Sequence, residues 1–285
     1  MKLTVLVDNN TIIDRYFLAE PGLSFFIQDE DKTVLFDTGY SGIFLDNAHK
    51  MGLDLANLDY LVFSHSHLDH TWGSDRLIKF YTELAIEKRP FKKPVLITHP
   101  ETFTSVSSDD FDELGSLLSK AKLEKHFTMQ LSREPLKLTE RLTFLGEIPR
   151  KNSFESASTY GRKEGADEED QVVEDSALVY ESNKGLVIIT GCSHAGICNI
   201  CEYAKEVCST EKIAEIIGGL HLLNPKEIQL QGTLDYLKIL QPYAVHACHC
   251  TDLNSKIALS QVVNIKEVGV GLSVIYHKVV STGII

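Results

Sequence analysis

Short apolar runs separated by polar turns open the chain. Four of them lie at Leu3–Val7, Leu23–Gln28, Val34–Phe36 and Leu61–Phe63. Runs of this length, rich in Val, Leu, Ile and Phe, are typical of β-strands. The polar segment Gln28–Lys32 predicts a hairpin between the second and third runs. We therefore expect the N-terminal part to form a meander that feeds a larger sheet.

From Ala177 onward, apolar runs alternate with helical patterns. The expected strands are Ala177–Tyr180, Leu186–Thr190, Ile213–Ile217 and Tyr243–Ala247, and a helix is predicted at Ile197–Val207. Alternation of strands and helices is typical of α/β layers. If these strands are parallel, side chains that follow them meet at one edge of the sheet.

The middle of the chain is less regular. A buried strand is predicted at Pro94–Thr98, and leucines at helical spacing predict a helix over Asp109–Phe127. Ser153–Asp170 has no periodicity and contains an acidic run, so we expect a solvated loop that in an enzyme can act as a lid. We interpret residues 1–285 as a single domain with a helical and loop insertion around 100–172.

Composition and charge restrict the classes of partner. The chain has 285 residues, 43% of them hydrophobic, which suits a large folded core. Its formal net charge of −12 repels phosphate backbones and anionic lipids, so we expect neither nucleic-acid nor membrane partners. A bound metal would reverse the charge locally, so a small-molecule substrate is expected, including a phosphorylated or anionic one. Composition leaves the oligomeric state open.

The N-terminal residues have no apolar signal region, and no long apolar run follows, so we expect a cytoplasmic protein. All six cysteines lie in the last third of the chain, which is not the pattern of a secreted disulfide framework. Cys198 and Cys201 form a CxxC within the predicted helix. Either they serve a structural zinc or a redox reaction, or they are reduced buried thiols, and we favour the second interpretation.

Four potential metal ligands follow the apolar run Leu61–Phe63. They are His65, His67, Asp69 and His70. Two histidines two residues apart in extended chain project to the same side, and a turn then directs Asp69 and His70 towards a second metal. Imidazoles with one carboxylate suit zinc, iron or manganese, and two adjacent metals can share a bridging hydroxide. The alternative is a polar surface loop.

The hexad His65–His70 resembles the HxHxDH motif of the metallo-β-lactamase superfamily. Leu35–Gly39 resembles the strand and aspartate that support the ligand loop in that family. Three further segments resemble its dihydropterin synthase-like branch, whose archaeal members include an enzyme of methanopterin synthesis: Ile188–Gly196, with the letters GCSHAG, Gly218–His221 and His249–Thr251. The resemblance extends over nearly the whole chain.

The sequence differs from the branch at a few positions within the hexad and directly after it. Thr71-Trp72-Gly73 follows it where the branch has Thr-Gly-Gly, and Ser66 and Leu68 replace its common Gly and Tyr. None of these changes removes a ligand. Trp72 is expected to narrow the mouth of the pocket.

The resemblance implies an α/β (α+β) fold, the four-layer αββα sandwich. It also implies two divalent metal ions as cofactors, zinc first, with iron, manganese or magnesium as alternatives. Its implied ligands are His65 and His67 for one metal and Asp69 and His70 for the other, completed by His194 and His249. Asp37 would act from behind the ligands.

Two positions differ from the superfamily pattern. Cys192 stands where most members have a bridging aspartate, with His194 just beyond it, and which metal His194 serves is left open. Asp175 stands near the place of a further histidine ligand. It is either a supporting residue, or weaker ligand, of the site or an acid in a solvated turn.

His221 follows the predicted strand Ile213–Ile217, and we expect it to donate a proton or support a ligand, with direct metal binding as the alternative. His246 faces another way on its strand and is interpreted as structural. No functional role is expected for the remaining histidines, which are His49, His99, His126 and His277.

The leading functional hypothesis is a metal-dependent hydrolase acting on a small ester, phosphoester or related substrate. In it Asp69 orients the nucleophile and His221 protonates the leaving group. A second hypothesis is a transferase that condenses a dihydropterin pyrophosphate with an aromatic phosphate. A third is a non-catalytic metal or ligand sensor.

Overall fold

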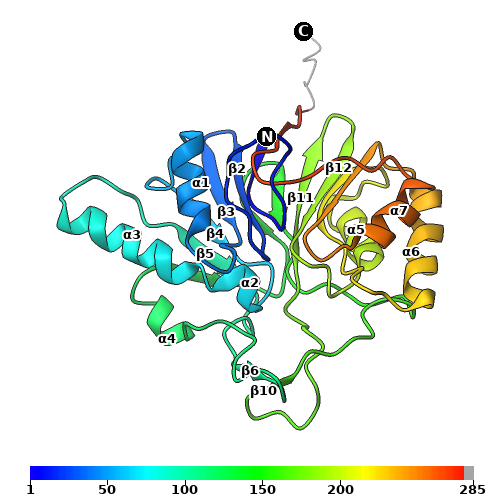
Figure 1. Cartoon of the computed structure of the whole chain (residues 1–285), viewed down its shortest axis with the longest axis horizontal. Coiled ribbons are helices and arrows are strands. Elements are labelled where there is room, and N and C mark those ends of the chain that lie inside the picture. The colour runs from blue at the N-terminus through cyan, green and yellow to red at the C-terminus, as the bar shows by residue number, and fades with distance from the viewer. Residues whose placement is uncertain (279–285) are drawn as a thin grey trace.

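Two β-sheets stacked face to face form the centre of the computed structural model, which describes residues 1–278 (Figure 1). The first sheet has the strand order β15 (Ser273–Ile275), β1 (Lys2–Val7), β2 (Ser24–Asp29), β3 (Lys32–Phe36), β4 (Tyr60–Val62), β5 (Val95–Thr98) and β7 (Thr128–Leu131). The second has the order β14 (Ala244–Cys248), β13 (Ile213–Gly219), β12 (Gly185–Thr190), β11 (Ala177–Ser182), β9 (Leu142–Phe144) and β8 (Leu136–Lys137).

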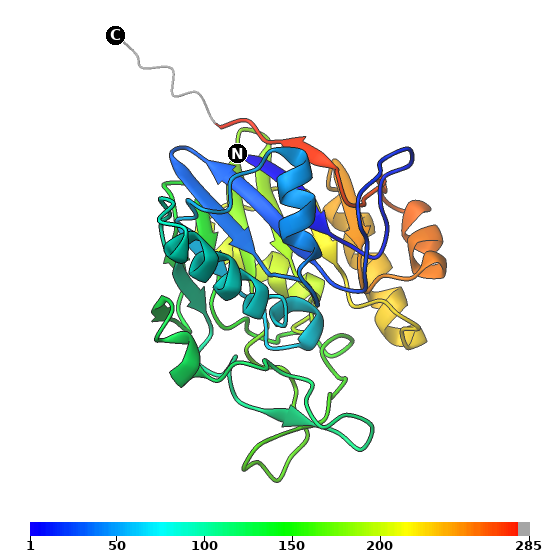
Figure 2. The same cartoon turned by 60° about the vertical axis from the view of Figure 1, so that its left-hand side comes forward.

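Helices cover the outer face of each sheet. α1 (Ile43–Met51) and α3 (Ser74–Ile86) lie on the first sheet, and α5 (Ile197–Cys208), α6 (Glu227–Leu240) and α7 (Leu253–Ser260) lie on the second (Figures 1 and 2). Two single-turn helices, α2 (Leu68–Thr71) and α4 (Lys120–Leu123), belong to connections. The layer order is therefore helix, sheet, sheet, helix, which confirms the predicted αββα sandwich.

Three apolar clusters fill the spaces between these four layers. Phe25 and Tyr180 pack between the sheets, Phe44 and Leu77 pack between the first sheet and its helices, and Ile200 belongs to the cluster beneath α5. All five side chains are buried. Burial of one such side chain contributes roughly 1.5–3 kcal/mol, so both sheets are fixed on both faces. A rigid frame of this kind can hold side chains at its edge in a defined geometry.

The first sheet begins with the predicted meander. β1 pairs antiparallel with β2, and β2 with β3, with Asp29 opposite Lys32 at the turn. The predicted hairpin is confirmed. β3, β4, β5 and β7 then run parallel. The carboxyl ends of β3 and β4 consequently lie at the same edge of the sheet, where Asp37 and His65 follow them.

The second sheet has the predicted α/β connections. β11 and β12 form an antiparallel hairpin, and β12, β13 and β14 are parallel, linked through α5 and α6. The carboxyl ends of these three parallel strands meet at one edge.

The helix predicted over Asp109–Phe127 is wrong for most of its length, since helical geometry is confined to Lys120–Leu123. The carboxylate of Glu113 accepts hydrogen bonds from the backbone N–H groups of Val106 and Gly115, at 3.0 and 2.7 Å. The carbonyl of Leu114 accepts from the N–H of Leu68. These contacts hold the chain in a turn, and leucine spacing alone does not reveal them.

The predicted loop at 153–170 is largely irregular, with one short strand, β10 (Arg162–Lys163), paired to β6 (Val106–Ser107). This pair lies below the sheets in Figure 1. Lys163 anchors the segment through ion pairs with Glu101, Asp170 and Glu174. Because Glu101 and the buried Glu174 lie outside the segment, these ion pairs attach it to the rest of the fold by charge as well as by backbone pairing.

Candidate metal centre

The histidine-rich hexad lies at the carboxyl end of β4. His65 and His67 are in extended chain, and α2 then begins at Leu68, so that Asp69 and His70 belong to a helical turn. The carbonyl of His67 accepts hydrogen bonds from the N–H groups of His70 and Thr71, at 3.0 and 3.1 Å. This turn separates the first two ligand candidates from the second two.

The ends of β12, β13 and β14 bring three more histidines to the same place. His194, His221 and His249 follow these strands, and Ser193, His221 and His249 have positive φ angles of 64°, 54° and 51°. Such backbone strain in residues other than glycine gathers at functional sites. A Cβ atom at Gly191 would lie 2.1 Å from the Ser64 hydroxyl, so glycine is what allows β12 to end against the hexad.

His65, His67 and His194 form the first cluster, with one ligand atom of each within 4.8 Å of the others. Nε2 of His65, Nε2 of His67 and both ring nitrogens of His194 are buried and have no hydrogen-bond partner among the described residues. Burial lowers the pKa of all three imidazoles, that of His67 to about 4. Buried neutral nitrogens without partners suit a metal ion, because they would otherwise lose hydration without compensation.

Asp69, His70 and His249 form the second cluster. Nε2 of His249 lies 3.2 Å from Oδ2 of Asp69 and 3.1 Å from Nε2 of His70. Burial lowers the pKa of His249, but the hydrogen bond to Asp69 and neighbouring negative charges outweigh it and raise that pKa to about 9. Burial raises the pKa of Asp69, but the charges of His70 and His249 hold it well below its usual value. The cluster therefore combines one carboxylate with two imidazoles.

Asp37 lies behind both clusters and joins them. It is fully buried and has a φ of 58°. Its carboxylate accepts hydrogen bonds from the backbone and hydroxyl of Ser64 at 2.7 Å, and it lies 2.7 Å from Nδ1 of His70. The Ser64 hydroxyl in turn lies 2.8 Å from Nδ1 of His65. One carboxylate thus fixes the rings of a histidine in each cluster, as expected of a residue that orients metal ligands.

A cavity of about 600 Å³ opens over the two clusters. The ligand candidates on its wall are His67, Asp69, His194 and His249, with His221, Cys192 and Cys250 beside them. Leu223 and Leu253 line it with side chains that are 64% and 71% exposed, and Lys256 adds a positive charge. The lining therefore suits a substrate with both an apolar part and a polar or anionic part.

Comparisons with known proteins agree with this geometry. The family model described as the metallo-beta-lactamase superfamily matches residues 18–105, which include Asp37 and the hexad. An uncharacterised protein of Methanocaldococcus jannaschii is 30% identical over 92% of this chain and 95% of its own length. The chain belongs to the metallo-beta-lactamase superfamily.

Two other similar proteins have names that state different activities, one a synthase and the other a hydrolase. The 7,8-dihydropterin-6-methyl-4-(beta-D-ribofuranosyl)-aminobenzene-5'-phosphate synthase of Methanocaldococcus jannaschii is 29% identical over 90% of this chain and 89% of its own. A crystal structure described as a metal-dependent hydrolase of the beta-lactamase superfamily has a TM-score of 0.79 at 25% identity, covering 96% of this chain and 98% of that chain. The predicted resemblance to the superfamily and to its dihydropterin synthase-like branch is confirmed.

Cys192 was not among the predicted ligands, although it stands where most superfamily members have a bridging aspartate. Its sulfur lies 3.2 Å from Nε2 of His70 and within 4.8 Å of a ligand atom of His65. The structure thus keeps Cys192 at the junction of the two clusters and places His194 with His65 and His67. The sequence left open which metal His194 serves, and the geometry groups it with His65 and His67.

Asp175 is fully buried, so its interpretation as an acid in a solvated turn is wrong. It accepts a hydrogen bond from the backbone N–H of Ala195 at 2.8 Å. Burial raises its pKa to about 7. Asp175 is absent from the ligand clusters found among residues 1–278. Its contact supports the loop that carries His194.

Tyr160 is a site residue that the sequence did not reveal. Its hydroxyl is hydrogen-bonded to Nε2 of His221, and its ring lies 4.8 Å from that of His194 and 5.7 Å from that of His67, centroid to centroid. No periodicity or motif marks Tyr160, because it belongs to the irregular segment. The one indication in the sequence is that Tyr160 belongs to Ser153–Asp170, the aperiodic segment for which we expect a loop that can act as a lid.

The remaining predictions concern residues away from the clusters. Nε2 of His246 lies 3.3 Å from a carboxylate oxygen of Glu215, and Nε2 of His99 lies 3.0 Å from one of Glu147. Trp72 stacks on Tyr40 and donates a hydrogen bond to the carbonyl of Gly115, and it is not part of the cavity lining.

The CxxC pair packs inside α5. Cys198 and Cys201 are both buried, and burial raises the pKa of each thiol. Neither belongs to a ligand cluster among the described residues, which agrees with reduced buried thiols.

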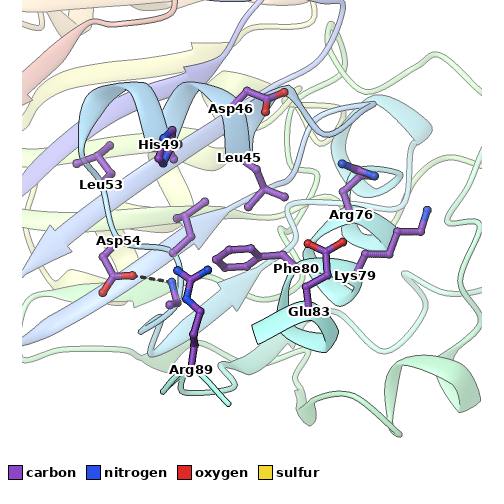
Figure 3. Close-up of a pocket in the computed structure, with 13 residues that line it drawn as sticks. Leu45, Asp46, His49, Leu53, Asp54, Arg76, Lys79, Phe80, Glu83 and Arg89 are labelled. Carbon is purple, nitrogen blue, oxygen red and sulfur yellow. Dashed lines mark hydrogen bonds between the residues drawn. The ribbon is translucent and has the colours of Figure 1, made fainter. Parts of the chain in front are cut away.

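A second groove, of about 350 Å³, lies between α1 and α3 on the outer face of the first sheet (Figure 3). Leu45 and Phe80 line it together with charged side chains such as Arg76 and Glu83. His49 lies there, distant in the fold from the ligand clusters. Because none of the clustered ligands lines this groove, we do not take it as the reactive site.

Among residues 1–278, the helices are all too short or too polar to cross a lipid bilayer.

Proposed function

We propose that the protein is a metal-dependent hydrolase that acts on a small ester, phosphoester or related substrate. The observation that carries this proposal is the pair of adjacent ligand clusters, one with three neutral imidazoles and the other with a carboxylate and two imidazoles, at the floor of an open cavity. Buried ring nitrogens without partners are the specific feature that favours metal ions over a hydrogen-bonded core.

Each cluster would hold one divalent cation, and zinc suits a set dominated by imidazoles, with iron or manganese as alternatives. The proposed ligands are His65, His67 and His194 for one ion, and Asp69, His70 and His249 for the other, with Cys192 between them. Two cations held in this way supply an activated water molecule and polarise the bond to be cleaved.

The protein's own residues would position the reactants. Asp69 accepts a hydrogen bond at the floor of the cavity, so it can orient the attacking water. Asp37 prevents rotation of the rings of His65 and His70 through the contacts given above. His221 and Tyr160 share a hydrogen bond on the cavity wall, and this pair can deliver a proton to a leaving group.

A panel of small esters, phosphodiesters and lactones tests the proposal, using metal-free protein reconstituted with zinc, manganese or iron. We expect turnover that requires added metal, and we expect His67→Ala to lose both one bound cation and that turnover while its circular dichroism is unchanged. His49→Ala, in the groove between α1 and α3, is the matched control. Full metal occupancy without turnover on any member of the panel would instead favour a non-catalytic sensor.

A transferase is the second candidate, and the relative named as a synthase favours it. In that reaction the cations would hold a pyrophosphate leaving group while an aromatic co-substrate attacks a dihydropterin pyrophosphate. Pyrophosphate release that occurs only in the presence of the aromatic co-substrate would identify the transferase. Release without it would identify hydrolysis.

A further inference from the structure

A third group of ligand-type side chains lies beside the two clusters. Cys192, His221 and Cys250 follow β12, β13 and β14, and one ligand atom of each lies within 4.8 Å of the others. All three line the 600 Å³ cavity. Two sulfurs and one imidazole form a softer set of ligands than the carboxylate and imidazoles nearby.

The two ring nitrogens of His221 differ in their hydrogen bonds. Nε2 is bonded to the Tyr160 hydroxyl, whereas Nδ1 is buried and has no hydrogen-bond partner among the described residues. A histidine that binds a metal through one nitrogen usually has its other nitrogen bonded to an orienting group. Tyr160 is such a group for His221, which leaves Nδ1 as the nitrogen available to a cation.

The two cysteines are held in place by backbone contacts. Cys250 Sγ lies 3.3 Å from the backbone N–H of His221, which donates to it, and 3.4 Å from the carbonyl oxygen of Cys192. His221 has its φ of 54° at this point, so the strained strand end directs both its N–H and its ring towards the sulfurs. Neither cysteine is in a disulfide.

We propose that Cys192, His221 and Cys250 form a third metal site, for a soft divalent cation such as Zn²⁺, which shares Cys192 with the junction of the two clusters. Three protein ligands with an open fourth position facing a cavity are typical of zinc sites that bind a substrate. Both sulfurs would bind the cation as thiolates, with any thiol proton displaced by the cation released to solvent, so that two thiolates balance the charge of the cation. The inference goes beyond the hydrolase proposal, because it does not depend on which reaction the other clusters catalyse.

His221 can serve this site and the proton pathway together, because the two roles use different ring nitrogens. With Nδ1 on the cation, Nε2 carries a proton and donates it in a hydrogen bond to the Tyr160 oxygen. The Tyr160 hydroxyl is then free to donate towards the cavity. Tyr160→Phe should therefore weaken cation binding at the third site alone.

Titration of the reduced, metal-free full-length protein with Co²⁺ tests the proposal. Optical absorption and elemental analysis count the bound ions, and the near-ultraviolet charge-transfer band of cobalt reports thiolate ligands. We expect the wild type to bind three equivalents with a strong thiolate band. Cys250→Ser should bind two equivalents with a weaker band. Cys208→Ser, a change to a half-buried cysteine on α5, should behave like the wild type.

Two results in the comparison of the wild type with Cys250→Ser would overturn the third site. One is saturation of the wild type at two equivalents. The other is a charge-transfer band and a stoichiometry that are the same in Cys250→Ser and in the wild type. Should Cys250→Ser prove unfolded by circular dichroism, Tyr160→Phe provides the second test, with an expected loss of at least tenfold in affinity for the third equivalent only. An unchanged third affinity in that variant would also contradict the proposal. This test is separate from that of the hydrolase. The hydrolase proposal depends on turnover and on its loss in His67→Ala, whereas the third site depends on the number of cations bound by the wild type and by Cys250→Ser.

Discussion

Nε2 of His249 lies 3.2 Å from Oδ2 of Asp69, and the two residues are separated by 180 positions in the chain. Burial lowers the pKa of His249, yet the hydrogen bond to Asp69 and neighbouring charges raise it to about 9. At pH 7 the imidazole of His249 in the metal-free site is therefore protonated on both ring nitrogens and positively charged. A cation that binds through this ring must displace that proton.

This relationship predicts how cation affinity depends on pH. Affinity at the second cluster should rise with pH up to about 9, because the competing proton leaves His249 over that range. In Asp69→Asn the negative partner is lost, burial dominates, and the pKa of His249 should fall. NMR titration of histidine ring signals in the metal-free protein measures both values, with His49 as an internal reference. A His249 titration that is the same in both proteins would contradict the assignment.

The same shift predicts a pH dependence of metal-free stability. The pKa of His249 in the folded state is above its unfolded value of about 6.5, so its stabilising contribution is present below that value and is lost as pH rises through about 9. The free energy of unfolding of the wild type should therefore fall relative to that of Asp69→Asn as pH rises from 6.5 to 9. Urea denaturation at a series of pH values provides the measurement.

Asp37→Asn tests how far the supporting hydrogen bonds tune the ligands. The wild-type carboxylate accepts from Ser64 and contacts Nδ1 of His70. An amide presents an N–H where an acceptor is needed, so His70 should lose its orientation. We expect cation affinity to fall by roughly 10–100-fold, measured by competition with a chromogenic chelator. Asp59→Asn, which changes a carboxylate bonded to Thr33 at the other end of the sheet, should leave affinity unchanged.

Tyr160→Phe tests the proton pathway. The ring contacts with His67 and His194 remain, and the hydroxyl bonded to His221 is removed. We expect kcat to fall by about 100-fold, as is typical when a proton donor is lost. We expect a much smaller change in KM, with one cation still bound in each of the two clusters. Tyr236→Phe is the control, since its hydroxyl donates to Glu202 on α5. Equal kcat values for the two variants would remove Tyr160 from the reaction.

Glu155→Gln tests the support of α5, whose preceding loop carries Cys192 and His194. The buried carboxylate of Glu155 accepts from the backbone N–H groups of Cys198 and Asn199 at 3.1 and 2.7 Å, groups that have no partner within the helix.

Glutamine has one acceptor oxygen, so one of these N–H groups should lose its partner. We expect the free energy of unfolding to fall by about 1–3 kcal/mol, measured by chemical denaturation. Glu206 lies on the same helix and forms an exposed ion pair with Lys151, which is outside the helix. Glu206→Gln removes that ion pair and should change stability by less than about 1 kcal/mol. Equal stabilities for the two variants would contradict the role of Glu155.

The sequence predicted the strands well because strand formation here depends on local apolar runs. Each run from Leu3–Val7 to Tyr243–Ala247 has a strand at or within a few residues of its predicted position. The helix over Asp109–Phe127 failed for the opposite reason. The side chain of Glu113, within the segment, and the backbone N–H of Leu68, outside it, form hydrogen bonds that compete with helical ones. Leucine spacing carries no information about such contacts.

The sequence by itself determined the hexad from His65 to His70, because its ligands are neighbours in the chain and a strand followed by a turn suffices to divide them between two clusters. Only the tertiary structure decided that His194 joins His65 and His67, that Cys192 stays at the junction, and that Tyr160 lies against His221. These side chains are separated by up to about 130 positions from the hexad. Cys192 and His194 meet the hexad because parallel strands from two stacked sheets end at one edge. Tyr160 reaches His221 from the irregular segment that Lys163 anchors. Both arrangements are properties of packing and not of spacing.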